Sequence, residues 1–143
     1  MKKILIAVLI SFLTTVAAWG QSPATARIQV LAVPEENTTL EIGPPEATVI
    51  YEFAPSDPQN GNVWVDTTAG FIPCPEVTCV LQEFVDRFET RLQAHASAMD
   101  VTFTRSGNQF FFETVTTGAA TNQYVLISTT DAICLAFCGG SDR

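Results

Sequence analysis

The chain has 143 residues, a formal net charge of −8 and a hydrophobic content of 47%. Such an excess of acidic side chains repels nucleic acids and anionic membrane surfaces, which argues against both as partners. The lysines, Lys2 and Lys3, both lie at the amino terminus, so the rest of the chain has no amine side chain for Schiff-base or isopeptide chemistry.

Residues 1–20 have the layout of a cleavable secretory signal peptide. Lys2 and Lys3 precede an uncharged run over residues 4–16, which is followed by Ala-Ala-Trp-Gly up to Gly20. This run of about 13 residues is shorter than the roughly 20 needed to span a bilayer. We therefore expect cleavage after Gly20 and export by the general secretory route, which gives a periplasmic or extracellular protein without a membrane anchor.

The mature chain is expected to form a single domain over residues 27–143, preceded by a flexible lead over residues 21–26. Alternation of apolar and polar residues predicts strands, and turn-forming Pro, Gly and Asn residues separate them. The predicted strands span residues 27–33, 38–42, 47–53 and 63–66 before the helix and residues 100–105, 109–115, 122–129 and 132–137 after it.

One long amphipathic helix is predicted from about residue 75 to about residue 98. Most of its charged residues fall on one side, where Glu83 and Arg87 are four apart and can pair. Its apolar residues recur at three- and four-residue steps and form a stripe that faces a core, namely Val80, Leu81, Phe84, Val85, Phe88, Leu92, Ala96 and Met99. The order of elements predicts an α+β fold, in which a mostly antiparallel sheet carries this helix on one face.

The mature chain keeps four cysteines, Cys74, Cys79, Cys134 and Cys138. In an oxidising compartment, an even number of cysteines in a small domain predicts two disulfides. The alternative is one zinc ion held by four thiolates, but its usual spacing is two residues within each pair, and here the gaps are four and three. An extended chain would place Cys134 and Cys138 about 13 Å apart, so bonds from the carboxyl tail to the 74–79 segment are expected.

The loop over residues 54–62 offers a candidate calcium site. Asp57, Asn60, Asn62 and Asp66 carry side-chain oxygens within ten positions, and Ca²⁺ binds such oxygens. The ordered spacing of an EF-hand loop is absent, and polar turns share this composition. The pattern favours a turn over a metal site, and no cofactor is expected.

No catalytic residue is predicted. The single histidine, His95, falls near the end of the helix, where histidines more often interact with the terminal carbonyls. Glu52 and Glu113 could act as a glycosidase pair only if the fold brought them together, and acidic side chains are mostly solvated. Three arginines could bind a carboxylate or sulfate, although ordinary surface pairing is expected among so many acids: Arg87, Arg91 and Arg105.

The aromatic run over residues 110–112 predicts an exposed phenylalanine. On a strand, Phe110 and Phe112 share one face, and Phe111 shares the other with Val115. When the helix covers the first face, Phe111 and Val115 emerge on the uncovered one. Such an apolar patch is either capped by another part of the chain or offered to a partner, which would be a protein, a glycan or a second copy.

The segment over residues 77–129 combines the helix, the strand Val101-Thr102-Phe103-Thr104, the Gly107-Asn108 turn, a strand through Phe112, and a Gly118-to-Asn122 loop before the next strand. In these features it resembles the helix–hairpin–strand module of phage tail sheath and tail tube proteins and of the flagellar hook repeat family. The resemblance covers less than half of the chain, and it implies structural or binding work without catalysis.

Three functions are compatible with the sequence. The expected one is an exported, non-enzymatic binding or structural module that acts through protein or glycan contact or surface assembly. The second is a small secreted inhibitor of a hydrolase that presents a disulfide-held loop over residues 70–79. The third, a hydrolase built on carboxylates, is less favoured because nothing in the sequence places a pair of carboxylates together.

Overall fold

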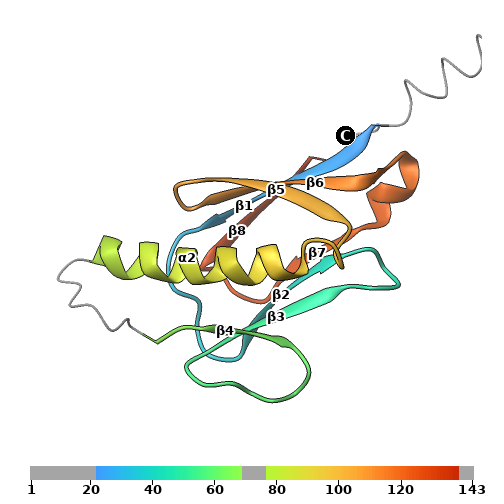
Figure 1. The fold of residues 1–143 in the computed structure, drawn as a ribbon. Helices are drawn as coiled ribbons and strands as arrows, with labels where there is room; N and C mark the ends of the chain where they lie inside the picture. Colours follow the sequence, from blue (N-terminus) through green and yellow to red (C-terminus); the bar gives the residue numbers. More distant parts are fainter. Residues whose placement is uncertain (1–21, 69–76, 139–143) are drawn as a thin grey trace, which may run out of the picture.

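The computed structural model describes residues 22–68 and 77–138. Within them the chain forms two four-stranded sheets and one long helix (Figure 1). The predicted signal peptide lies outside the described residues. None of the helices in the described part of the chain has both the length and the apolar character needed to cross a membrane.

The first sheet, here called sheet A, has the strand order β5-β6-β1-β8 and is antiparallel throughout. Its strands are β5 (Val101–Ser106), β6 (Gln109–Thr117), β1 (Pro23–Val30) and β8 (Ile133–Cys138). The β5–β6 hairpin turns through Gly107, whose φ of 62° is a left-handed conformation that glycine adopts without strain. A short 3-10 helix, η1 (Ala119–Gln123), follows β6.

The second sheet, sheet B, has the strand order β4-β3-β2-β7. Its strands are β4 (Val63–Asp66), β3 (Val49–Ala54), β2 (Thr38–Gly43) and β7 (Val125–Ser128). Strands β3 and β4 are parallel, because the loop over residues 55–62 carries the chain back along β3 before β4 begins. The other two pairings are antiparallel. A short connection joins β7 to β8, so the two sheets lie next to each other at these strands.

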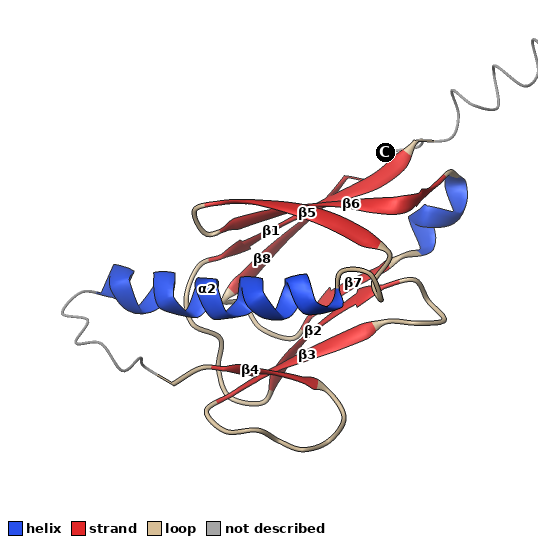
Figure 2. Cartoon of the chain, in the orientation of Figure 1, coloured by secondary structure: helices blue, strands red, loops and turns tan. Residues whose placement is uncertain are grey.

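Helix α2 (Val77–His95) lies between the two sheets and packs against both of them (Figure 2). Phe88 is completely buried, and its ring centroid lies 5.8 Å from that of Tyr51, 5.5 Å from that of Phe53 and 5.6 Å from that of Phe110. Tyr51 and Phe53 belong to β3 in sheet B, and Phe110 belongs to β6 in sheet A. The apolar stripe of the helix therefore joins the two sheets into one hydrophobic core.

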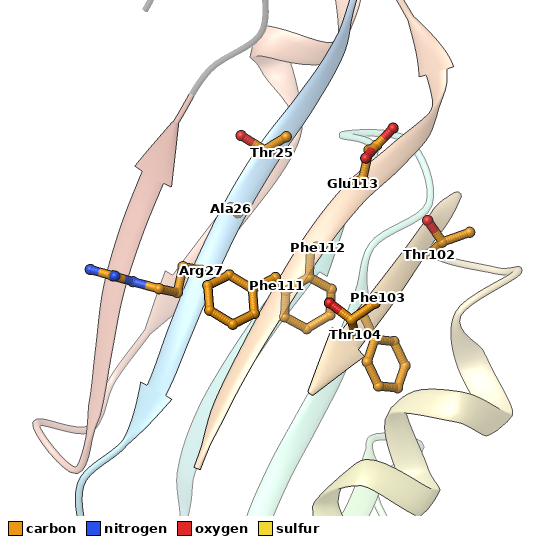
Figure 3. A pocket seen from close by; sticks show the side chains of 9 residues that line it. All are labelled: Thr25, Ala26, Arg27, Thr102, Phe103, Thr104, Phe111, Phe112 and Glu113. Carbon is orange, nitrogen blue, oxygen red and sulfur yellow. The ribbon is translucent and has the colours of Figure 1, made fainter. Parts of the chain in front are cut away.

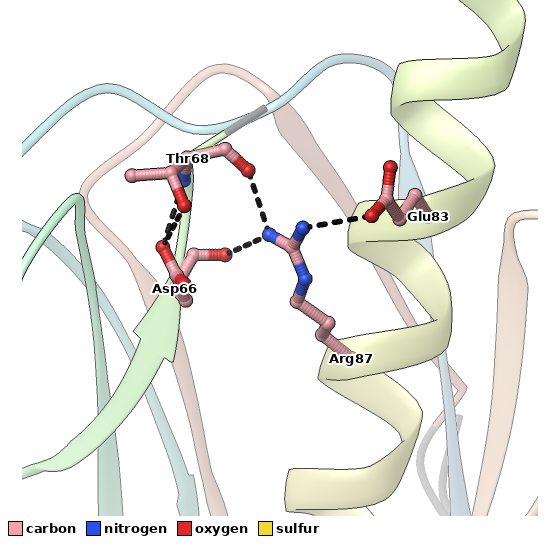
Figure 4. Close-up of polar contacts among 4 residues, drawn as sticks. All are labelled: Asp66, Thr68, Glu83 and Arg87. Atoms are coloured by element: carbon pink, nitrogen blue, oxygen red, sulfur yellow. Dashed lines mark hydrogen bonds and ion pairs between the residues drawn. The ribbon is translucent and has the colours of Figure 1, made fainter. Parts of the chain in front are cut away.

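Two arginines attach the polar side of the helix to the strands on either side of it. Arg105 of β5 donates to the carboxylate of Asp86 at 2.6 Å and to the side-chain oxygen of Gln82 at 3.2 Å. Arg87 of the helix forms the predicted ion pair with Glu83, at 3.1 Å, and also donates to backbone carbonyls at the end of β4 (Figure 4). Helix α2 is thus held by β5, an edge strand of the first sheet, and by β4, an edge strand of the second.

The prediction of one sheet stabilised by two disulfides is wrong. There are two sheets, and the helix contacts both. The prediction failed because the alternation within each strand does not specify which strands pair. Cys134 is exposed and forms no disulfide with any described residue. Cys74 lies outside the described residues, and only the backbones of Cys79 and Cys138 are described, in α2 and β8.

The amino-terminal lead differs from the prediction as well. Residues 23–26 were expected to be flexible, but they form the first half of β1 between β6 and β8. Ala24 is 1% exposed, and its backbone N–H donates to Thr114 Oγ1 at 3.0 Å. Small residues such as Ala24 give little strand signal by themselves, and here the neighbouring strands supply the hydrogen bonds that order the segment.

Candidate functional site

Sheet A presents an uncovered outer face, here called the contact face, on the side away from helix α2. Its side chains form two rows across neighbouring strands, set by the strand register. The first row is Thr104, Phe111 and Arg27, and the second is Thr102, Glu113 and Thr25. All six side chains are exposed, because the opposite face of each strand supplies residues to the core.

Phe111 lies at the centre of the contact face. Its neighbours on β6, Phe110 and Phe112, are 0% and 4% exposed, whereas Phe111 is 41% exposed and Val115 is 60% exposed. The alternation predicted for this strand is therefore confirmed. Within residues 22–68 and 77–138, no segment covers this exposed part of Phe111. Its ring is therefore available to a partner.

The surface around Phe111 is hollowed. A depression of about 500 Å³ is lined by side chains from β1, β6 and β5, and Figure 3 shows Phe111 between Arg27 and Thr104. Hydroxyl groups come from three threonines, and the two charged residues, Arg27 and Glu113, have opposite signs. The arrangement suits contact with a surface, because it combines a central aromatic ring with a polar rim.

The carboxylates considered for hydrolysis are not brought together. Glu113 lies on the contact face, whereas Glu52 lies on β3 in sheet B. Glu52 is 7% exposed, and its Oε2 accepts hydrogen bonds from the amides of Asn60 at 2.5 Å and Asn62 at 3.0 Å. Its role in this geometry is to hold the 55–62 loop against the sheet, since a buried carboxylate requires such donors.

The oxygens of the candidate calcium loop are used in local turns. Asp57 Oδ1 accepts the backbone N–H of Gln59 at 2.9 Å, Asn60 Oδ1 accepts that of Asn62 at 3.1 Å, and Asp66 Oδ1 accepts that of residue 68 at 2.8 Å. These bonds are typical of polar turns. No group of three or more His, Cys, Asp or Glu side chains suited to a metal ion occurs among the described residues.

His95 is the last residue of helix α2, and its surroundings are those of a structural residue. Its Nδ1 lies 3.0 Å from the carbonyl oxygen of Arg91, one helical turn earlier. Its ring contacts that of Tyr51 edge-on, with centroids 6.1 Å apart. Burial raises the pKa of Tyr51, whose hydroxyl donates to the sulfur of Met99 at 3.3 Å. The neutral phenol is therefore part of the core.

Asp100 was not singled out from the sequence, yet it joins three elements. It adopts a φ of 55° in the turn before β5, and its Oδ2 accepts hydrogen bonds from the backbone N–H of Thr116, at 3.2 Å, and from the hydroxyl of Tyr124. The bonds from Thr116 and Tyr124 lower the pKa of Asp100. Desolvation, followed by the bond to Asp100, raises the pKa of Tyr124. The sequence offers one hint of this role, which is the residue type itself, because Asp tolerates a positive φ better than most residues do.

A second depression, between α2 and β4, was also not predicted. It brings Arg87 and Arg91 of the helix beside Trp64 and Asp66 of the strand. The sequence marks Arg87 and Arg91 as able to bind an anion but favours ordinary surface pairing for both, and their nearness to Trp64 depends on how the helix packs.

No protein-family model and no curated protein sequence matches this chain.

Proposed function

We propose that this protein is an exported, non-enzymatic assembly module that binds protein surfaces through the contact face, with a second copy of itself as the primary partner. The observation that carries the proposal is the exposure of Phe111 at the centre of a hollowed sheet face with no covering segment in the described chain. Aromatic residues surrounded by polar ones are the usual energetic centres of protein interfaces.

The arrangement of charges favours a second copy. On β1 and β6, Arg27 lies opposite Phe111 and Thr25 lies opposite Glu113, so the four residues mark the corners of a four-sided figure. Arg27 and Glu113 lie at opposite corners, on either side of the diagonal from Phe111 to Thr25. A two-fold axis along that diagonal exchanges the two charged positions, so Arg27 of each copy faces Glu113 of the other, while the two Phe111 rings meet near the axis. A strongly acidic chain repels its own copies elsewhere, but this face carries one positive and one negative side chain.

The other proposed functions have less support. The loop over residues 70–79 that an inhibitor would present lies largely outside the described residues. A hydrolase would need paired carboxylates, and Glu52 and Glu113 belong to different sheets. The resemblance to tail and hook modules stays a prediction, and it agrees with assembly as the kind of work proposed. Export depends on the signal layout of residues 1–20.

Phe111→Glu is expected to abolish self-association of the protein purified after export. Sedimentation velocity at increasing concentrations should show the wild type shifting from monomer to dimer, while the variant stays monomeric because a carboxylate replaces the central ring. Ile127→Glu is the matched control, since Ile127 is 55% exposed but lies on β7 of sheet B. This control should dimerise like the wild type.

Exchange of the two charges gives a sharper test of the two-fold arrangement. Arg27→Glu and Glu113→Arg should each weaken the dimer, and the double variant should restore it, because each pair is re-formed with reversed signs. A wild type that remains monomeric over the whole concentration range would contradict self-assembly. Equal loss of the dimer in Ile127→Glu would contradict the choice of face.

A further inference from the structure

The depression between helix α2 and strand β4, here called the Trp64 groove, has the size of a small-molecule site. It measures about 440 Å³ and is lined by Trp64, Asp66, Arg87, Thr90 and Arg91. Small-molecule sites typically occupy ~300–1,000 Å³. None of these residues belongs to the contact face. The groove is therefore a separate place on the molecule, and its use does not depend on the proposed assembly.

The groove holds one arginine that is left for a ligand. Arg87 and Arg91 line it together with one acidic residue, Asp66, and Arg87 forms an ion pair with Glu83 at 3.1 Å, so Arg91 carries the positive charge that a ligand can meet. A positive side chain in a depression attracts ligands of the opposite sign. The groove is thus a place on this acidic protein where an anion is favoured.

The two arginines have different tasks. Arg87 is fixed by hydrogen bonds from its NH1 to the carbonyl oxygens of Asp66, at 3.2 Å, and Thr68, at 2.7 Å, and from its NH2 to Glu83 at 3.1 Å (Figure 4). Arg91, one helical turn further on, is exposed and forms no ion pair with residues 22–68 or 77–138. Its planar fork of donors can bind a carboxylate through two parallel hydrogen bonds.

Trp64 and Asp66 add features that a bare anion would not need. The indole Nε1 of Trp64 donates to the carbonyl oxygen of Ala54 at 2.9 Å, so the half-buried ring is held in place and offers a rigid apolar surface to the groove. Hydrogen bonds to the carboxylate of Asp66 from described residues reach Oδ1 alone, so Oδ2 can accept a hydroxyl. An apolar plate, a guanidinium and a hydroxyl acceptor together match a sugar ring that carries a carboxylate.

We propose that the Trp64 groove binds an acidic sugar of the uronic acid class. The carboxylate of the sugar binds the guanidinium of Arg91, the ring packs against Trp64, and a hydroxyl donates to Asp66. Arg87 keeps the end of β4 attached to the helix, so that the walls of the groove keep their spacing.

Fluorescence of Trp64 provides the test, because Trp64 is the only tryptophan beyond the predicted signal peptide. Titration of the exported protein with galacturonate should give a saturable change in emission. Galactose, which lacks the carboxylate, and acetate, which lacks the ring, should bind at least tenfold more weakly. Arg91→Gln should weaken galacturonate binding at least tenfold. Arg91→Lys keeps the charge without the planar fork, so its affinity for galacturonate should lie between those of the wild type and of Arg91→Gln.

Gln93→Ala is the matched control, since Gln93 is an exposed residue of the same helix that does not line the Trp64 groove, and its replacement should leave the titration unchanged. Absence of a saturable change with galacturonate would overturn the proposal, as would equal binding of acetate or galactose. Unaltered affinity in a folded Arg91→Gln protein would overturn the assignment of the carboxylate ligand. Failure of this test would leave self-association untouched, because the two surfaces share no residue.

Discussion

Replacement of Phe88 by alanine is expected to lower the free energy of unfolding by about 3–5 kcal/mol, the range measured for truncating a large aromatic side chain in a protein core. Phe88 is completely buried, and its ring contacts aromatic rings from both sheets, with centroids 5.5–5.8 Å away for Tyr51, Phe53 and Phe110. Its loss leaves a cavity where helix α2 joins the sheets. Equilibrium unfolding in urea, monitored by circular dichroism, measures the change.

Phe111→Ala is the matched control for Phe88→Ala. It removes the same side chain from an exposed position, so the free energy of unfolding of the monomer should change by no more than about 0.5 kcal/mol. The comparison must be made at concentrations at which both proteins are monomeric. Similar losses of stability in the two variants would contradict the position of the helix between the sheets.

Asp100→Asn is expected to lower stability at neutral pH by about 1 kcal/mol, because a neutral amide accepts the hydrogen bonds of Thr116 and Tyr124 less strongly than a carboxylate does. Asn tolerates the positive φ of this position, so the backbone is kept. The pKa of Asp100 is lowered in the folded protein, chiefly by the bonds from Thr116 and Tyr124. Its stabilising contribution is therefore present above the unfolded-state pKa, about 3.9, and is lost as the pH falls through the folded-state value.

The pH dependence separates this effect from a general loss of packing. The difference in unfolding free energy between wild type and Asp100→Asn should be largest near neutral pH. It should shrink as the pH falls below about 4, where Asp100 is protonated first in the unfolded chain and, at lower pH, in the folded protein. Glu36→Gln, which removes an exposed carboxylate outside the contact face, should show no comparable change. A difference that is constant from acidic to neutral pH would contradict the role assigned to the charge of Asp100.

Local patterns were sufficient to locate most elements. The strand Val63–Asp66 has the predicted limits, and the hairpin turn at Gly107 is where the Ser-Gly-Asn sequence placed it. The helix was predicted from its apolar stripe to within a few residues at each end. Strand limits, hairpin turns and helices depend on residues close to one another in the chain, so a short stretch of sequence is enough to predict them.

The arrangement of the strands was not accessible in the same way. Alternation states which side chains share a face, but many strand pairings satisfy the same alternation. The parallel pairing of β3 and β4 depends on the path of the 55–62 loop, which is in turn held by Glu52. The ordering of residues 23–26 depends on β6 and β8 on either side, which are distant in sequence.

The same difference between local pattern and tertiary arrangement applies to the candidate sites. The sequence by itself determined that Phe111 faces away from Phe110 and Phe112, because the period of a strand is two residues, and that the chain is strongly acidic. Only the tertiary structure decided that Thr25, Arg27, Thr102 and Thr104 surround Phe111, and that Trp64 lies beside Arg91. Such neighbours are set by packing among distant segments, where many weak contacts are satisfied together and no short stretch of sequence specifies the result.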